Sequence, residues 1–425
     1  MAEGFFAPLG DEYFVRPTED PAEALAQAAE IMNMPPAELL KNGWGGPIHQ
    51  FLHHPNVRDI MVQHNNSIWI RDKRGKKTTV PIKLNSKWVD FLAYNWRFAK
   101  TERTNFEIDP LANFRGTVFF PYSGGGVRFQ YVGSAFSALG SSIYIRQLPS
   151  APLDLSLMTA NGTLPQEAAD MLVTLMRVKT PIIISGQTGS GKTTFLGSLV
   201  QELQKMHDPL NMLVVEKSHE IPLINPAYRW EEDAEGQVKL QDLAAHATQM
   251  GLEWLVLGEC TGPEAYYVIK AFTQGVPVVT TLHAISATEA YRALVMLALE
   301  YVREPSLLPG LMKSLANEAV ISVNLEVRER PDGSMLGAVS GIEEIISVSG
   351  EKPVVNPLWL SKPDPETGLL KLVFNRGCVA QLSPATKLRF KVAGIPFPVP
   401  EKPQPQKAKT TPEPVQKPRG LFGRR

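Results

Sequence analysis

The chain has 425 residues, a length for which two or three domains are expected. Hydrophobic residues make up 44% of it and charged residues 20%, which excludes a wholly disordered protein. Lysine and arginine together number 43, as do aspartate and glutamate, so the formal net charge is zero. The chain therefore lacks the overall basic field of most sequence-independent nucleic-acid binders, although a local basic patch is compatible with this composition. We expect no direct binding of nucleic acid.

The cysteines and the apolar runs indicate a cellular compartment. Cys260 and Cys378 form neither a CxxC pair nor a metal-binding spacing, which suits a reducing cytoplasm. The first twenty residues lack a basic segment followed by an apolar run, so they do not predict a secretory signal. No stretch approaches the roughly 18 consecutive apolar residues of a membrane-spanning helix. We therefore expect a cytoplasmic protein that meets a membrane only through partners.

The two ends of the chain differ in composition. Residues 21–32 and 36–43 have the apolar spacing of helices, each with proline at the first position, so residues 1–47 predict a helical extension. Residues 395–425 are rich in proline and lysine. From Glu401 onward there are seven basic and two acidic residues, a net of 7 − 2 = +5. Such a segment buries too little apolar surface to order itself, and we expect a disordered tail.

The chain between these ends divides into two main regions. Alternating runs around the amphipathic segment 88–100 predict strands and a helix, so residues 48–146 are expected to form a smaller α+β domain. Residues 147–156 contain two prolines and fit a linker. Over residues 157–330, short apolar strands alternate with helical segments, which is typical of an α/β domain with a mostly parallel sheet. Residues 331–394 predict a C-terminal extension that contains β structure.

A glycine-rich motif follows the first apolar strand of the α/β region. GQTGSGKT, residues 186–193, matches G-x-x-x-x-G-K-[ST] in full, between a strand and a helix. Its glycines let backbone N–H groups converge on phosphates, and the helix adds its positive N-terminal end. Lys192 suits the β and γ phosphates, and the Thr193 hydroxyl suits Mg²⁺. The expected nucleotide-binding residues are Gly186, Gln187, Thr188, Gly189, Ser190, Gly191, Lys192, Thr193 and Thr194, with ATP and Mg²⁺ as cofactors.

Hydrolysis also requires groups that orient or activate water, and such residues stand at the ends of predicted strands. VVEKSHE provides Glu216 and Glu220, WLVLGE provides Glu259, and TTLHA provides His283. The alternative for each acid is a solvated position at the edge of the sheet, and for the histidine a capping or packing role. We favour a functional role for Glu259 and Glu216, whereas the residues alone leave both interpretations open for Glu220 and His283.

In this order the P-loop, the acidic segment, the Gly-Glu strand and TTLHA resemble the ATPases of type IV secretion, type II secretion and type IV or Tad pilus assembly. The resemblance runs from about residue 56 to about residue 349, and includes VRDIMVQHNNSIWIRD and SSIYIRQLPSAPLDL. It implies a homohexameric ring whose subunits hold ATP between an N-terminal domain and a RecA-like P-loop domain. Such a ring powers a secretion, conjugation or pilus-assembly complex, and binds its cytoplasmic parts at the inner membrane.

The resemblance also implies roles for the residues of the site. Glu259 would activate the attacking water, and His283 would read the γ-phosphate. The acidic segment with Glu216 and Glu220 would help to hold Mg²⁺ through waters. The ion itself would be bound by Thr193, with Glu216 and Glu259 contributing through water.

Two arginines of the N-terminal domain are expected at the phosphates in this family. Arg128 in GGVRFQ and Arg146 in YIRQL occupy the matching positions. A guanidinium offers two parallel donors to a phosphate, which suits this role. Without the resemblance, a solvated arginine on a strand explains each of them equally well.

The sequence departs from the family pattern at a few positions. Lys217 follows Glu216 where an aspartate is usual, and Thr261 stands where an arginine is common. Val276 replaces a usual histidine, and Glu253 a usual aspartate. These changes leave the phosphate-binding loop intact and predict slow turnover or altered contacts between subunits.

Other functions are compatible with a P-loop. A nucleic-acid translocase or helicase of the RecA-like class would need a basic channel segment with aromatic residues, and none is evident in the sequence. An ATP-binding scaffold would bind the nucleotide with little turnover. A small-molecule kinase would leave the N-terminal domain without a role. The hypothesis we favour is a motor, in which the ring uses ATP hydrolysis to drive a secretion, conjugation or pilus-assembly complex.

Overall fold

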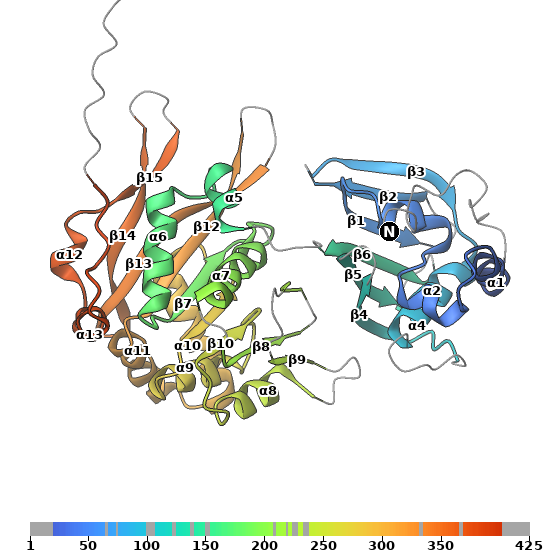
Figure 1. Cartoon of the computed structure of the whole chain (residues 1–425). Coiled ribbons are helices and arrows are strands. Elements are labelled where there is room, and N and C mark those ends of the chain that lie inside the picture. Colours follow the sequence, from blue (N-terminus) through green and yellow to red (C-terminus); the bar gives the residue numbers. More distant parts are fainter. Residues whose placement is uncertain are drawn as a thin grey trace, which may run out of the picture.

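The computed structural model describes residues 20–63, 67–73, 75–98, 107–120, 125–136, 140–148, 154–206, 210–217, 220–222, 228–232, 238–330, 335–364 and 369–401. In these residues the chain forms two sheets, each with helices packed on it, which confirms the expected α/β fold (Figure 1). No helix among the described residues has both the length and the apolar character needed to cross a bilayer.

The N-terminal sheet has six strands among the described residues, all antiparallel, in the order β3-β2-β1-β6-β5-β4. The strands are β1 (Val57–Gln63), β2 (Ser67–Asp72), β3 (Lys77–Lys83), β4 (Asn113–Phe120), β5 (Gly125–Val132) and β6 (Ser142–Leu148). The helices of this part are α1 (Pro21–Ile31), α2 (Pro36–Lys41), α3 (His49–Leu52) and α4 (Ser86–Phe98), with 3-10 turns η2 (Gly46–Ile48) and η3 (Ser134–Phe136).

One face of the N-terminal sheet is apolar and the other is polar. Ile60, Phe129 and Ile145 come from neighbouring strands and share a buried core with Trp88 of α4. Leu25 of α1, in the expected helical extension, belongs to the same core. Because side chains alternate along a strand, the residues between these apolar positions point to the opposite face. That second face carries the charged residues considered below.

The C-terminal sheet has nine strands in the described part, in the order β15-β14-β13-β12-β7-β11-β10-β8-β9. The strands are β7 (Ile182–Gly186), β8 (Met212–Glu216), β9 (Tyr228–Glu231), β10 (Trp254–Leu257), β11 (Val278–Leu282), β12 (Ile321–Glu329), β13 (Met335–Ser349), β14 (Lys352–Pro363) and β15 (Leu370–Phe374). The helices are α5 (Leu155–Ala160), α6 (Gln166–Arg177), α7 (Lys192–Met206), α8 (Leu240–Ala247), α9 (Ala265–Thr273), α10 (Ala287–Val302), α11 (Leu308–Asn317), α12 (Cys378–Gln381) and α13 (Pro384–Ala393), with the 3-10 turn η4 (Pro305–Leu307).

Helices cover both faces of this sheet (Figure 1). Ile182 and Ile184 of β7 pack with α5, α6 and α7, whereas Ile183 packs on the opposite face with α8 to α11. Every residue of β7, β8, β10 and β11 is buried. This agrees with their apolar sequences, which are typical of parallel strands between two helix layers.

The region expected as a C-terminal extension continues the same sheet. β12 pairs in parallel with β7, and then β13, β14 and β15 follow in antiparallel order. Without them, the outer edge of β12 would expose a row of backbone N–H and C=O groups, which the hairpin pairs instead.

The expected linker and tail are described only in part. Residues 147 and 148 belong to β6, and residues 149–153 lie outside the described residues. At the other end, Ile395 and Phe397 pack against the core, with the ring of Phe397 5.2 Å from that of Phe390. The chain therefore stays packed a few residues beyond the start of the expected tail, and residues 402–425 lie outside the described part.

Candidate functional site

The P-loop joins the end of β7 to the start of α7. Gly186 lies so close to β12 that a Cβ atom would overlap the carbonyl oxygen of Leu325. Gly191 has a φ of +89°, which residues with a side chain rarely adopt, and a Cβ there would meet nothing within 4 Å. The loop is therefore supported by β12 on one side and open on the other. On the open side its amides and the positive end of α7 can receive an anion.

Lys192 lies within the loop. Its side chain is buried, and Nζ donates to the carbonyl oxygens of Gly186 at 2.9 Å and Gln187 at 3.0 Å. Burial lowers the pKa of this ammonium, and the charge of Glu259 opposes the shift. Ser190 Oγ is also buried and meets no hydrogen-bond partner among the described residues. A phosphate chain would satisfy both the cation and the hydroxyl, so the residues present fit a nucleoside triphosphate.

The remaining loop residues are accessible. Gln187, Thr188 and Gly189 at the tip and Thr194 on α7 are exposed, and Thr193 is half-buried. In the described part of the chain, no group of three or more histidine, cysteine or acidic side chains could hold a metal ion. A Mg²⁺ ion at this site would therefore depend on the Thr193 hydroxyl and on phosphate oxygens, which agrees with the oxygen preference of that cation.

Glu259 and His283 meet the P-loop lysine at the carboxyl ends of neighbouring strands. Glu259 follows β10, His283 follows β11, and the sheet order β7-β11-β10 places these strand ends beside the loop. Nε2 of His283 lies 3.0 Å from Oε1 of Glu259, and Nδ1 lies 3.4 Å from Nζ of Lys192. The structure thus brings together three residues that the sequence places 91 positions apart at most. Both Glu259 and His283 keep more than 40% of their side-chain surface exposed, as groups that meet a ligand must.

Glu216 lies beneath this edge of the sheet and not at its surface. It is 2% exposed, and its Oε1 accepts hydrogen bonds from the backbone N–H groups of Glu220 and Ile221 at 3.0 and 2.9 Å. Nε of Arg229 lies 3.5 Å from its other oxygen. Burial raises the pKa of Glu216 to about 7, although Arg229 and the two amides lower it. In this position Glu216 organises the acidic segment and its ionisation is sensitive to a neighbouring charge.

The two candidate arginines have different partners. Arg128 of β5 forms an ion pair with Glu220 of the acidic segment. Arg146 of β6 donates from Nε to Oδ1 of Asp59 at 2.8 Å, and from its terminal nitrogen to the Tyr144 hydroxyl at 2.9 Å. The structure therefore brings Arg128 to the acidic segment, whereas the polar contacts of Arg146 lie within the N-terminal sheet.

Two of the departures from the family pattern lie in contact. The Lys217 ammonium, directly after β8, donates a hydrogen bond to the hydroxyl of Thr261 in the segment after β10. In the family pattern given above, position 217 carries an acid and position 261 carries a cation. The positive charge of this chain thus stands on the acidic segment, and Thr261 provides a neutral partner.

Two further residues were not identified as candidates from the sequence. A Cβ on Gly337 of β13 would overlap the carbonyl oxygen of Ser190, so β13 directly supports the P-loop. A glycine within a strand pattern, such as Gly337 in MLGAVSG, often marks such a close backbone approach. Asp59 is fully buried and binds Arg146. Its position in the alternating strand VRDIMVQ predicts a solvated residue, so the sequence offered little signal for it.

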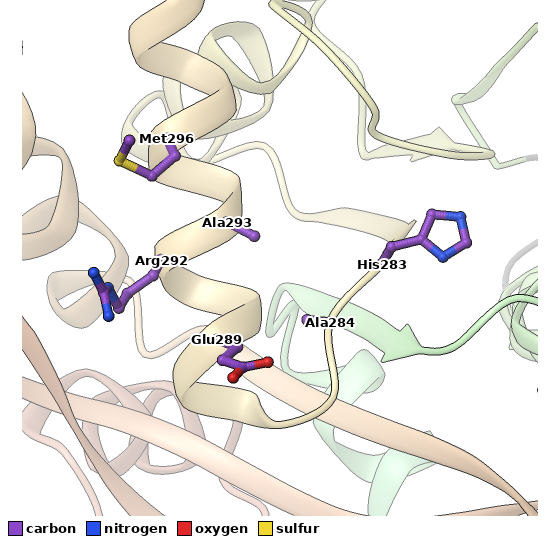
Figure 2. Close-up of a pocket in the computed structure, with 6 residues that line it drawn as sticks. All are labelled: His283, Ala284, Glu289, Arg292, Ala293 and Met296. Atoms are coloured by element: carbon purple, nitrogen blue, oxygen red, sulfur yellow. The ribbon is translucent and has the colours of Figure 1, made fainter.

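A pocket of about 270 Å³ lies between the segment after β11 and helix α10 (Figure 2). It is lined by His283, Ala284, Glu289, Arg292, Ala293 and Met296. The ring of His283 points away from α10 in this view, and Arg292 projects from the other side of the helix. Because these polar groups do not converge on one point, the pocket is a hollow beside the P-loop site and not a second polar site.

Comparisons with known proteins agree with this arrangement. The family described as "Type II/IV secretion system protein" matches residues 127–325. A protein of Mycobacterium tuberculosis (strain CDC 1551 / Oshkosh) that is named for conjugal transfer is 24% identical over 236 residues, which cover 54% of this chain and 66% of that protein. The type IV secretion system protein VirB11 of Bartonella quintana (strain Toulouse) is 27% identical over 154 residues, or 35% of this chain and 42% of that protein. The matches thus span less than two thirds of the length of these relatives.

A solved structure supports the fold. The ATPase DotB of Legionella pneumophila has 19% sequence identity and a TM-score of 0.52, over 79% of this chain and 83% of that one. The family match covers the strands, the P-loop and the acidic segments from which the site is built. Over residues 127–325, the chain is therefore similar to the type II/IV secretion superfamily of ATPases.

Proposed function

We propose that the chain hydrolyses ATP in a RecA-like P-loop domain preceded by a smaller α+β N-terminal domain. The observation that carries the proposal is the contact of Lys192 and Glu259 with the two nitrogens of His283. It lies at the carboxyl edge of parallel strands, where open α/β sheets bind their ligands. The similarity to type II/IV secretion system proteins, and to the fold of the ATPase DotB, supports the same activity.

The P-loop binds the triphosphate in this proposal. Loop amides and the N-terminal end of α7 receive the phosphate oxygens, and Lys192 exchanges its bonds to the carbonyls of Gly186 and Gln187 for bonds to the β and γ phosphates. Thr193 would hold Mg²⁺, with Glu259 contributing through water, and the ion would offset the negative charge of the phosphates, whereas the buried Glu216 would act through the acidic segment that it organises.

Glu259 then acts as the base that orients and deprotonates the attacking water. His283, at 3.0 Å, orients this carboxylate and links it to the Lys192 ammonium, so that the acid is aligned only when the lysine is in place. Arg128 and Arg146 bind phosphate oxygens from the N-terminal sheet, which requires Arg128 to leave its ion pair with Glu220. The ion pair between Arg128 and Glu220 therefore belongs to a state that precedes the chemical step.

We further propose that the chain assembles as a homohexamer in the cytoplasm and drives a type IV secretion, conjugation or pilus-assembly machine. It would bind the cytoplasmic parts of an inner-membrane complex and have no direct contact with nucleic acid. Relatives named for conjugal transfer and for type IV secretion support this class of machine.

A second candidate is an ATP-binding scaffold with little turnover. The contact between Lys217 and Thr261 favours it, because the charges beside the catalytic edge differ from the family pattern. Phosphate release at saturating Mg·ATP separates the two functions. A motor releases phosphate faster as wild type than as Glu259→Gln, whereas equally low release by both proteins indicates a scaffold. Strong stimulation of the release by DNA would instead indicate a translocase.

A further inference from the structure

A row of six residues, five of them charged, crosses the polar face of the N-terminal sheet. Residues directly opposite each other in antiparallel strands share one face, and the strand register links six of them into one line. From β3 to β4, the row is Lys77, Arg71, Asp59, Arg146, Arg128 and Thr117. It contains four cations and a single carboxylate.

Asp59 is the centre of this row. Its Oδ1 accepts from Nε of Arg146 at 2.8 Å, and Oδ2 lies 3.1 Å from Nε of Arg58 and 3.5 Å from a terminal nitrogen of Arg71. The carboxylate is fully buried, which is tolerated because arginines surround it. Burial acts to raise its pKa, but the bonds from Arg146 and Tyr144 and the nearby charges outweigh burial, so the pKa lies below its usual value.

Arg146 and Arg128 stand directly opposite each other on β6 and β5. Like charges in this relation repel and destabilise a sheet unless an acid balances them. Asp59 balances Arg146 from one side, and Glu220 pairs with Arg128 from the other. Each arginine still exposes about a third of its side chain, at 37% for Arg146 and 35% for Arg128. The two guanidiniums are therefore held as neighbours with part of each open to a ligand.

We infer that Asp59 is a positioning residue, which holds Arg146 beside Arg128 so that the two guanidiniums form one phosphate-binding pair. The inference rests on the proposed function, in which both arginines meet the phosphates of ATP. Without the carboxylate, repulsion from Arg128 turns Arg146 away, and the side chain must be ordered again each time a nucleotide binds. Asp59 itself touches no phosphate, so its effect on the nucleotide passes through Arg146.

The experiment is a double-mutant cycle on the full chain with Asp59→Asn, Arg146→Ala and the double variant. Michaelis–Menten kinetics of ATP hydrolysis and the midpoint of thermal unfolding are measured for each protein. Asp59→Asn is expected to raise KM about tenfold in the wild-type background and by less than about twofold in the Arg146→Ala background. The unfolding midpoint should fall in both backgrounds, because Arg58 and Arg71 lose a partner in each.

Asp90→Asn is the matched control. Asp90 is a carboxylate of the same part of the chain, and it accepts a hydrogen bond from the Tyr131 hydroxyl at 2.7 Å. Its change to an amide should leave KM as in wild type. If Asp59→Asn is too unstable to assay, Arg146→Lys tests the same relation, since an ammonium keeps the charge but loses the guanidinium bonds to Asp59 and Tyr144. This variant should raise KM toward the value of Arg146→Ala, and a KM as in wild type would overturn the inference.

The outcomes separate this inference from the proposed function. If the wild-type chain neither binds nor hydrolyses ATP, the proposed function fails, and the inference fails with it. If Arg146→Ala raises KM but Asp59→Asn does not, only the positioning role is overturned. Equal effects of Asp59→Asn on KM in both backgrounds would show a structural role, and they also overturn it.

Discussion

The ammonium Nζ of Lys192 lies 3.4 Å from Nδ1 of His283. The other ring nitrogen lies 3.0 Å from Glu259 Oε1, so one imidazole connects the P-loop lysine to the expected catalytic acid. In a neutral imidazole one ring nitrogen carries a hydrogen and donates, while the other accepts, and the tautomer decides which nitrogen has which role. With Nε2–H donating to Glu259, Nδ1 accepts from Lys192, and this tautomer satisfies all three groups.

Lys192→Ala should abolish tight binding of Mg·ATP. The change removes the buried cation of the P-loop and its bonds to the carbonyls of Gly186 and Gln187. Titration calorimetry with Mg·ATP provides the measurement, and affinity should fall by at least about 100-fold, the scale expected when a charged hydrogen-bond donor is lost from a buried site. Lys205→Ala serves as the control, because Lys205 lies at the far end of α7 and pairs with Asp154. Undiminished binding by Lys192→Ala would remove this lysine from the site.

Glu259→Gln should retain ATP binding and lose hydrolysis. The amide keeps the size of the side chain and a contact with His283, but it cannot accept a proton from water. Loss of a general base typically costs about 10²- to 10⁴-fold in rate. Single-turnover phosphate release, with binding measured in parallel, tests the prediction. Turnover equal to wild type would exclude Glu259 from the mechanism.

The contact of Lys217 with Thr261 predicts a charge swap that works only as a pair. Lys217→Asp alone should lower the free energy of unfolding, because it adds a third acid near Glu216 and Glu220. Thr261→Arg alone should also lower the free energy of unfolding, because it places a second cation beside Lys217. The double variant should recover part of both losses, with a coupling of about 0.5–1 kcal/mol in unfolding free energy. Denaturant unfolding of the four proteins measures the coupling, and additive losses would contradict it.

The buried position of Glu216 predicts a pH dependence of stability. Its pKa is raised by burial to about 7 in the folded chain, from the usual 4.5 of a glutamate side chain. A carboxyl with a raised folded pKa favours the fold most below the unfolded pKa, and this contribution is lost as the pH rises through the folded pKa. Between about pH 4.5 and pH 7, wild type should therefore lose stability relative to Glu216→Gln.

The size of this effect follows from the shift, which corresponds to about 3 kcal/mol between pH 4.5 and 8. Denaturant unfolding of wild type and Glu216→Gln across this range measures it. Glu253→Gln is a suitable comparison, since the Glu253 side chain is 43% exposed and accepts from the backbone N–H of Asn211. A stability difference between wild type and Glu216→Gln that does not change with pH would show that Glu216 stays ionised.

Local and periodic features of the fold could be predicted from the sequence. The P-loop depends on eight consecutive residues, and the apolar strands before Glu216, Glu259 and His283 predict a shared edge because parallel strands align their carboxyl ends. Contacts between distant segments could not be predicted in this way. The acid that binds Arg146, at position 59, and the strand that supports the P-loop, at Gly337, are both specified by register between strands far apart in the chain.

The sequence also could not show how the expected pieces of the C-terminal part connect. Alternation in residues 331–394 predicts strands, but it does not identify the strand with which they pair. β13 pairs with β12, whose other neighbour is β7, and so the β structure after residue 330 continues the P-loop sheet. Lys217 and Thr261, which both differ from the family pattern, lie 44 residues apart in the sequence, and only the fold shows that they are in contact.

The fit of Gly337 against Ser190 couples the nucleotide loop to a hairpin that lies well after it in the chain. A Cβ atom at position 337 would overlap the carbonyl oxygen of Ser190, so any side chain there would push the P-loop and the hairpin of β13 and β14 apart. A residue larger than glycine at this one position of β13 would consequently change the shape of the P-loop although it lies more than 140 residues after it.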